Sequence, residues 1–237
     1  MDENIIDIKN IHLDYPVYGL NKSLRSLIVK RKKNTVNFIK ALDGVSLEIK
    51  DGDRIGLVGK NGSGKTTLLK TIGGIYIPSS GSINLKYSPF TMFDINMGLN
   101  LEATGVENIY LLSYLRGISK EQISLRLKSI IEFADIGKFI NLPLTTYSTG
   151  MIIRLATAIA LENKHQILLI DEFFGAGDPD FVEKTQERLE KKINEIRALV
   201  FACHNHKLVN SICNRIIVME KGKIVSDINN SNKNFYK

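Results

Sequence analysis

The stretch of residues 59–67 constrains this chain more than any other part of its sequence. It reads Gly-Lys-Asn-Gly-Ser-Gly-Lys-Thr-Thr and satisfies the pattern G-x-x-x-x-G-K-[ST]. Its glycines let the backbone curl, so that successive N–H groups can point at one anion. Residues 54–58 before it have the composition of a short buried strand, and residues 67–72 after it have helical spacing. A strand, a glycine-rich loop and a helix N-terminus together predict a phosphate-binding site.

The side chains of this loop suit a nucleoside triphosphate. Lys65 supplies a positive charge for the β- and γ-phosphates, and Thr66 supplies a hydroxyl ligand for Mg²⁺. The dinucleotide pattern G-x-G-x-x-G is not satisfied, because Thr67 stands where its third glycine would be. The predicted phosphate contacts of the loop are Gly59, Asn61, Gly62, Ser63, Gly64, Lys65, Thr66 and Thr67.

The length, the cysteines and the charge of the chain limit its domain number and its cellular compartment. The 237 residues suffice for one large domain or two small ones, and no apolar run approaches the ~18–20 residues of a membrane span. No signal peptide is visible, and Cys203 and Cys213 form no C-x-x-C pair, so we expect the cytosol or the cytosolic face of a membrane. The net charge is +7, and residues 15–42 hold seven Lys or Arg and no acidic residue.

The remaining sequence alternates strand and helix signals, which predicts an α/β fold with a mainly parallel sheet and helices on its faces. A helical block, which contains a capping box at Ser119 and Gln122, reads as an insertion. Strands are expected at 4–14, 41–50, 54–58, 82–86, 166–170 and 199–203, with a final hairpin over 215–227. Helices are expected at 21–33, 67–72, 105–117, behind Ser119, from about 149, and at 181–197.

A pair of carboxylates follows the apolar strand at residues 167–170. Asp171 would lie at the C-terminal end of this strand, where ligands bind in open α/β sheets, and is predicted to hold Mg²⁺ directly or through water. Glu172 is placed to polarise the attacking water, a step worth roughly 10²–10⁴ in rate. The alternative is an ordinary strand end with two solvated acids, which the upstream phosphate loop disfavours.

Residues 147–151, Tyr-Ser-Thr-Gly-Met, resemble the signature loop of ATP-binding-cassette (ABC) ATPases, usually Leu-Ser-Gly-Gly-Gln. Ser148 and Gly150 are kept, while Tyr147, Thr149 and Met151 depart from it. Walker A at 59–66, this signature, Walker B at 167–172, a D-loop-like segment at 175–178 and a histidine at 204 follow the cassette order over nearly the whole chain. The resemblance implies one ABC ATPase domain over 1–237: a RecA-like P-loop core, an N-terminal antiparallel β subdomain, and a helical subdomain inserted at about 98–158.

The resemblance also implies roles for single residues. His204 would contact the γ-phosphate, while His12 and His165 are expected to be surface or packing residues. Ser148 and Gly150 would act on the ATP of a second copy, in a homodimer that sandwiches the nucleotide. Adenine would stack on Tyr15 or, alternatively, on Tyr18. The other possibility is that both tyrosines only pack against the hairpin. Where the family usually has a Gln that couples Mg²⁺ to the membrane subunit, this chain has Asp94, which accepts but cannot donate a hydrogen bond when ionised.

Three runs narrow the resemblance to ATPase subunits of bacterial polysaccharide exporters, which serve O-antigen, capsule or teichoic acid export. They are the signature, the Asp-Glu-x-x-x-x-Gly-Asp run at 171–178, and the run at 98–108; a basic insertion at about 19–40 is also similar. The resemblance implies export of a lipid-linked polysaccharide, powered by two copies bound to a separate polytopic permease at the cytoplasmic face of the plasma membrane. We expect no C-terminal carbohydrate-binding domain.

Two other functions stay open. An ABC ATPase could serve another exported substrate, such as a lipid or a drug. A nucleic-acid-associated ABC ATPase would suit the basic block, but we expect nucleic acid to be an unlikely partner, because the helical block is compact and the basic block lacks interleaved aromatics apart from Phe38. The cations from Lys22 to Lys40 either form a solvated face or meet anionic headgroups or the pyrophosphate of a lipid carrier.

Overall fold

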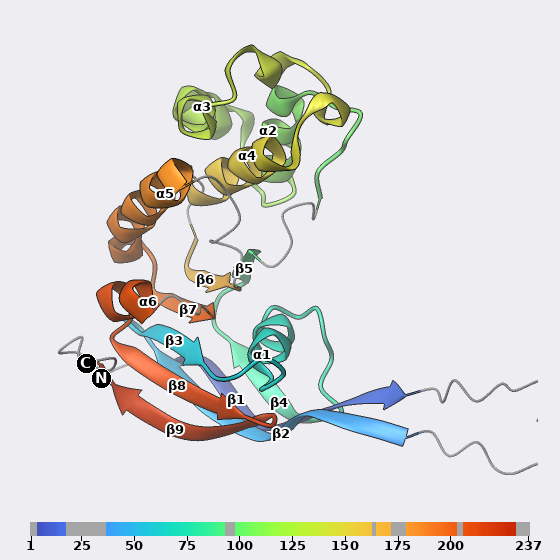
Figure 1. Ribbon diagram of the computed structural model, residues 1–237, viewed down its shortest axis with the longest axis vertical. Coiled ribbons are helices and arrows are strands. Elements are labelled where there is room, and N and C mark those ends of the chain that lie inside the picture. The colour runs from blue at the N-terminus through green and yellow to red at the C-terminus, as the bar shows by residue number, and fades with distance from the viewer. Residues whose placement is uncertain are drawn as a thin grey trace, which may run out of the picture.

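The computed structural model of the protein describes residues 4–17, 37–92, 98–162, 165–171, 179–202 and 206–230. Several residues predicted from the sequence to be functional lie outside these ranges. They are Tyr18, the cations from Lys22 to Lys33, Asp94, Glu172, the segment 175–178 and His204. The described elements form two sheets and a separate group of helices (Figure 1).

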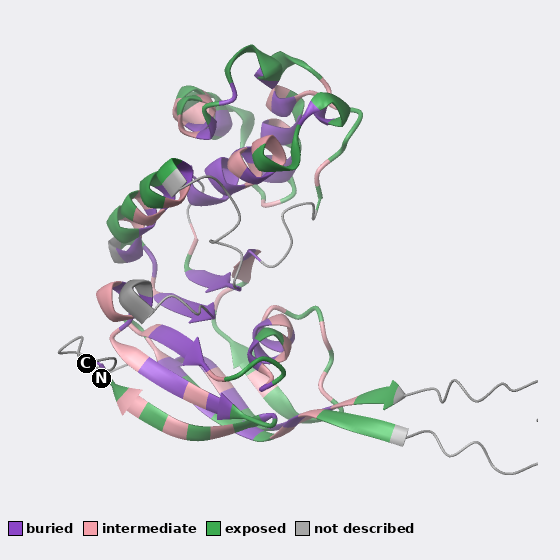
Figure 2. Cartoon of the chain, in the orientation of Figure 1, coloured by how far each residue is buried: buried purple, intermediate pink, exposed green. Residues whose placement is uncertain are grey.

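The larger sheet has, among the described residues, the strand order β5-β6-β7-β3-β8-β9. Neighbours pair in parallel from β5 to β8, and β9 closes the edge by antiparallel pairing with β8. Residues of β6 and β7 are buried throughout, as expected of parallel strands covered on both faces (Figure 2). The strands are β3 (Arg54–Val58), β5 (Pro89–Met92), β6 (Ile167–Ile170), β7 (Ala198–Ala202), β8 (Arg215–Glu220) and β9 (Lys223–Asn229).

The smaller, antiparallel sheet has the order β2-β1-β4, with β1 at Asn4–Val17, β2 at Asn37–Lys50 and β4 at Ser80–Leu85. The β1–β2 ladder continues to the pair Val17 and Asn37, so the two strands project together beyond the sheet (Figure 1). We call residues 14–17 and 37–40 the β1–β2 arm. The predicted break after residue 14 and the predicted strand start at 41 are therefore wrong. β4 pairs with β1 only as far as His12, so Pro16 lies on an open edge, where a missing N–H is tolerated.

The helical block has its own core, separate from the sheets (Figure 1). It contains α2 (Gly105–Tyr114), α3 (Lys120–Ala134), the 3₁₀ turns η2 (Gly137–Asn141) and η3 (Leu144–Thr146), and α4 (Thr149–Glu162). The predicted capping box at Ser119 and Gln122 is present, and a second one joins Thr104 to Glu107 at the start of α2. α2 ends at Tyr114 rather than 117, and α4 runs on to Glu162 before the chain enters β6.

Three helices, α1 (Lys65–Ile72), α5 (Pro179–Lys192) and α6 (His206–Ile212), contribute buried residues to the cores that contain the strands of the larger sheet. The helix predicted at 181–197 ends at Lys192 and passes into a 3₁₀ turn, η5 (Ile193–Glu195). Just past this end, the guanidinium of Arg54 donates to the carbonyls of Ile193 and Ile196 at 2.5 and 2.7 Å, and the Arg197 N–H donates to the carbonyl of Gln166 rather than continuing the helix.

The predicted fold class is confirmed: a mainly parallel sheet, an antiparallel β unit and an inserted helical block are all present. The strand β5 and the helix α6 were not predicted, because each is too short to give a clear period. None of the helices in the described part of the chain is long and apolar enough to cross a bilayer.

Candidate nucleotide site

The carboxyl ends of four parallel strands meet at one edge of the larger sheet. Met92 pairs with Ile170, Ile170 with Phe201, and Leu57 with Ala202, so β5, β6, β7 and β3 all end level with one another. The loop 59–64 follows β3 at this edge, and the nearly buried Asp171 follows β6 with its N–H directed at the carbonyl of Met92. This is the edge at which open α/β sheets bind ligands.

Glycine is required at two positions of the loop by contacts from distant segments. A Cβ on Gly59, whose φ is 152°, would lie 2.3 Å from the carbonyl oxygen of Met219 in β8. A Cβ on Gly64, whose φ is 106°, would lie 3.0 Å from the carbonyl oxygen of Ala41 in β2. The Gly222 N–H, in the β8–β9 turn, donates to the carbonyl of Ser63 at 2.9 Å. The loop is therefore held by β2 and by the β8–β9 hairpin.

Lys65 opens α1 and is only 5% exposed. Its ammonium donates to the carbonyl of Gly59 at 2.8 Å, so the side chain folds back along the loop and its ammonium lies there. The first turn of α1, all of which is described, holds no acidic side chain, and Gly64 provides no side-chain cap. The helix N-terminus and Lys65 both bring positive charge to the loop, which favours an anion.

Two further observations fit a nucleoside triphosphate. The hydroxyl of Ser63 is buried and has no hydrogen-bond partner among the described residues, a state that costs about 1–3 kcal/mol unless a ligand accepts the bond. A cavity of about 420 Å³ opens beside it, a size typical of small-molecule sites. Its walls come from Tyr15 in β1, from Ile39, Lys40 and Ala41 in β2, and from Asn61 to Thr67.

Tyr15 lies on the wall of this cavity, as base stacking requires. Its ring also packs edge-on against Tyr76, with centroids 5.8 Å apart. Burial raises the pKa of Tyr15, while a hydrogen bond from the Thr67 side chain acts in the opposite direction. Both sequence hypotheses for Tyr15, the adenine contact and the packing role, thus match its surroundings, and the adenine contact remains a prediction.

The signature segment lies on the helical block, at the start of α4, away from the loop at the sheet edge (Figure 1). The hydroxyl of Ser148 accepts from the N–H of Met151 at 3.2 Å, so Ser148 caps the helix as predicted. Tyr147, which departs from the usual Leu, is nearly buried and donates its hydroxyl to the carbonyl of Phe139 at 2.7 Å. Ser148 and Gly150 beside it are exposed.

The sequence interpretation missed the β2 side of the cavity. Ile39, Lys40 and Ala41 were assigned to the basic insertion or to a strand start, whereas β2 already begins at Asn37. The missed signal is the set of β-branched and aromatic residues Val36, Phe38 and Ile39, which favours a strand. The contacts of Met219 and Gly222 with the phosphate loop could not be predicted from local sequence, because they join segments far apart in the chain.

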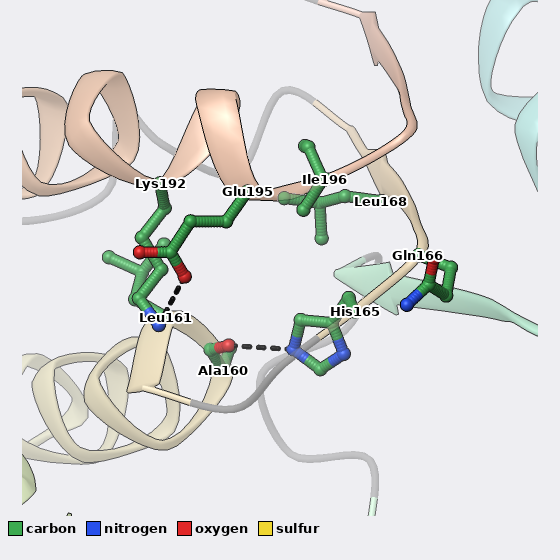
Figure 3. Close-up of a pocket in the computed structure, with 8 residues that line it drawn as sticks. All are labelled: Ala160, Leu161, His165, Gln166, Leu168, Lys192, Glu195 and Ile196. Atoms are coloured by element: carbon green, nitrogen blue, oxygen red, sulfur yellow. Dashed lines mark hydrogen bonds and ion pairs between the residues drawn. The ribbon is translucent and has the colours of Figure 1, made fainter. Parts of the chain in front are cut away.

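A second cavity, of about 370 Å³, lies where α4, β6 and η5 meet, at the amino end of β6 (Figure 3). His165 borders it, bonded through Nε2 to the carbonyl of Ala160 at 2.9 Å and stacked on Phe90 with centroids 3.9 Å apart. Burial lowers the pKa of His165 to about 4, so the ring is neutral near pH 7. His165 is a packing residue, as predicted, and this cavity lies at the opposite edge from the phosphate loop.

Comparison with known proteins decides the family. A sequence profile described as "ABC transporter" matches residues 42–175, more than half of the chain. This chain belongs to the ABC transporter family. The activity of ABC ATPases, ATP hydrolysis coupled to transport, therefore applies to it.

Its similarity to individual ABC proteins extends over nearly the whole chain. It is 40% identical over 228 residues to the O-antigen export system ATP-binding protein RfbE of Yersinia enterocolitica, covering 92% of this chain and 95% of that protein. It is 37% identical over 220 residues to the teichoic acids export ATP-binding protein TagH of Staphylococcus epidermidis, covering 92% and 82%. Among solved structures, the dimeric ABC transporter cassette MJ0796 shares its fold, with a TM-score of 0.73, 24% identity, and coverage of 94% and 98%.

Proposed function

We propose that this chain is the ATP-hydrolysing subunit of an ABC transporter that exports a lipid-linked polysaccharide of the O-antigen, capsule or teichoic acid type across the cytoplasmic membrane. The observation that carries the proposal is 40% identity along 95% of an O-antigen export ATP-binding protein. Teichoic acids export proteins match at 37% identity and support the same substrate class. The subunit would bind peripherally, at the cytoplasmic face, to a separate polytopic permease.

The proposed nucleotide contacts begin at the loop. The N–H groups of Gly59 to Thr67, the Ser63 hydroxyl and the Lys65 ammonium would receive the phosphates of ATP, while Tyr15 would meet the base. Thr66, Asp171 and Asp94 would hold Mg²⁺, which when bound neutralises charge on the β- and γ-phosphate oxygens. Glu172 would accept a proton from the attacking water, and His204 would donate to the γ-phosphate.

The positions of the described strand ends support these assignments. Glu172 follows Asp171 directly, Asp94 comes two residues after Met92, and His204 comes two residues after Ala202. The strands β6, β5 and β7 that precede them end level with β3 and its loop. All three predicted residues therefore follow strands that deliver the chain to the edge at which the phosphate loop begins.

We further propose that the working unit is a homodimer in which each ATP lies between the loop of one copy and Ser148–Gly150 of the other. The exposure of Ser148 and Gly150 at the N-terminus of α4 supports this, because a helix N-terminus that is open to a partner favours phosphate. Each charge-assisted hydrogen bond to the γ-phosphate would contribute about 1.5–3 kcal/mol. ATP would then hold the two copies together, and its hydrolysis would release them.

The test is ATPase activity of the chain reconstituted with its permease in proteoliposomes. We expect lipid-linked polysaccharide to stimulate hydrolysis, and neither the lipid carrier without glycan nor added DNA or RNA to do so. Equal stimulation by a lipid or drug without glycan would favour an exporter of another substrate. Stimulation of the isolated subunit by nucleic acid would contradict the proposal and favour a nucleic-acid-associated ATPase.

A further inference from the structure

Ile39 is an unusual residue on the β1–β2 arm, because a large apolar side chain is left 60% exposed there. It pairs directly opposite Tyr15, so both side chains stand on the same face of the two-stranded ladder. Both also line the cavity at the phosphate loop. The neighbouring Phe38 is equally exposed, at 62%, but strand alternation directs it to the other face, and it does not border the cavity.

We propose that Ile39 is a positioning residue for the nucleotide base, forming with Tyr15 a single apolar surface that one face of the base covers. This inference rests on the proposed ATP site. The phosphates lie at the loop, so the base end of the nucleotide extends along the cavity toward the arm that forms its other wall. The side chains of a directly opposed cross-strand pair have Cβ atoms about 4.5–5.5 Å apart, which makes a surface comparable in width to a purine ring.

The surroundings hold this pair in place before any ligand arrives. Tyr15 is braced edge-on by Tyr76, and the backbone on both sides of it is paired, Asp14 with Lys40 and Pro16 with Phe38. At the base of the arm, the carboxylate of Asp43 pairs with Lys223 at 3.1 Å, which joins β2 to the hairpin that braces the loop. Binding to a surface that is already ordered loses little conformational entropy, so its apolar contact adds directly to affinity.

The experiment compares Ile39→Ala with Phe38→Ala in the full chain. We expect Ile39→Ala to raise the Kd and KM for ATP about fivefold, equivalent to about 1 kcal/mol, with kcat unchanged. Ile39→Leu should restore the wild-type Kd, because it replaces the apolar area. Phe38→Ala should stay within about twofold of the wild type, since it removes an equally exposed side chain from the opposite face.

Inorganic tripolyphosphate serves as a probe that has phosphates but no base. Its affinity should be the same for the wild type and Ile39→Ala, because the variant leaves the loop intact. An Ile39→Ala chain that binds ATP as tightly as the wild type overturns the inference, and so does an equal loss of ATP and tripolyphosphate affinity. Loss of export in both alanine variants with unchanged ATP binding would assign the arm to a membrane or permease contact instead. A wild-type chain that binds neither ligand would contradict the ATP site itself, a result distinct from all of these.

Discussion

The phosphate loop and the signature segment, residues 147–151, both carry predicted phosphate contacts, and the contacts that hold them differ. The loop is shaped by distant segments: Met219 leaves no room for a Cβ at Gly59, Ala41 would lie 3.0 Å from a Cβ at Gly64, and Gly222 bonds to the carbonyl of Ser63. The signature segment is held by residues of its own helical block, through the Ser148 cap and the bond from Tyr147 to Phe139, eight residues earlier. The loop depends on contacts from distant strands, whereas the signature segment is held within its own helical block, where Gly105 of α2 also lies against the Tyr147 hydroxyl.

The difference bears on the proposed nucleotide site, which would draw on both segments. The loop gains a fixed shape, because β2 and the β8–β9 hairpin hold it against the sheet. The signature segment belongs to a block with its own core, so its shape survives a change in the position of that block. Variants at the loop and at the signature should therefore differ in what they damage, and the predictions below test this from the largest expected effect to the smallest.

The largest effect should come from the chemistry beside the loop. Glu172→Gln removes the proposed proton acceptor while keeping the size of the side chain, so we expect ATP to bind, turnover to fall by at least about 100-fold, and an ATP-bound dimer to accumulate. Lys65→Ala should instead weaken nucleotide binding by roughly 10-fold or more, because a charge-assisted contact is lost. Binding and steady-state ATPase assays separate the two outcomes. Wild-type turnover in Glu172→Gln would remove Glu172 from its role.

The signature segment should act across the dimer. We expect Ser148→Arg and Lys65→Ala homodimers each to lose nearly all ATPase activity, because both of their sites are damaged. A mixed dimer of the two variants keeps one site with an intact loop and an intact signature, so it should regain activity, up to about half that of the wild type. The measurement is ATPase activity of purified mixed dimers. A mixed dimer as inactive as its parents would place Ser148 with the nucleotide of its own chain.

The contact between the helical block and strand β5 should respond to acid. Arg116 of the helical block lies 4.2 Å over the ring of Phe90 in β5, which in turn stacks on His165. The pKa of His165, about 4, lies below the unfolded value of 6.5, so the stability it provides is complete above pH 6.5 and is lost as the pH falls toward 4. The loss amounts to about 3 kcal/mol.

His165→Phe keeps an aromatic ring for the stack and removes the titration. We expect the free energy of unfolding of the wild type, relative to this variant, to decrease by about 3 kcal/mol between pH 7 and pH 4. The lost bond to Ala160 should shift the comparison by an amount that does not depend on pH. Denaturant unfolding of both proteins across this range is the measurement. If the free energies of unfolding of the two proteins change in parallel with pH, the titration of His165 does not contribute to the loss of stability.

The smallest effect should come from the local caps of the helical block. Thr104→Ala and Ser119→Ala each remove a side chain that accepts a bond from the third residue of its helix, so each should cost about 1 kcal/mol of stability. Because the loop is held by other segments, the Kd for ATP should be unchanged. Thermal unfolding and nucleotide titration of the same samples check both parts, and a large loss of ATP affinity would show that the two regions are not held independently.

The sequence by itself determined the features whose causes are local. The strand, loop and helix at 54–72, the capping box at Ser119, the cap at Ser148 and the apolar strand leading to Asp171 all depend on residues within a few positions of one another. The resemblance of five ordered motifs then indicated the ABC family, which the profile match over 42–175 confirms. The predicted roles of Asp94, Glu172 and His204 stay predictions, because those residues lie outside the described ranges.

Only the tertiary structure decided the features that depend on pairing at long range. Arg54 bonds to carbonyls 139 and 142 residues away, just past the end of α5, and no local period signals that contact. The position of Ile39 opposite Tyr15 depends on the register of a ladder that continues past Pro16, where the sequence alone predicted a break. Local propensity fixes which way a short segment tends to fold, whereas register and bracing depend on which distant surfaces are buried together, and those become definite only when the whole chain has packed.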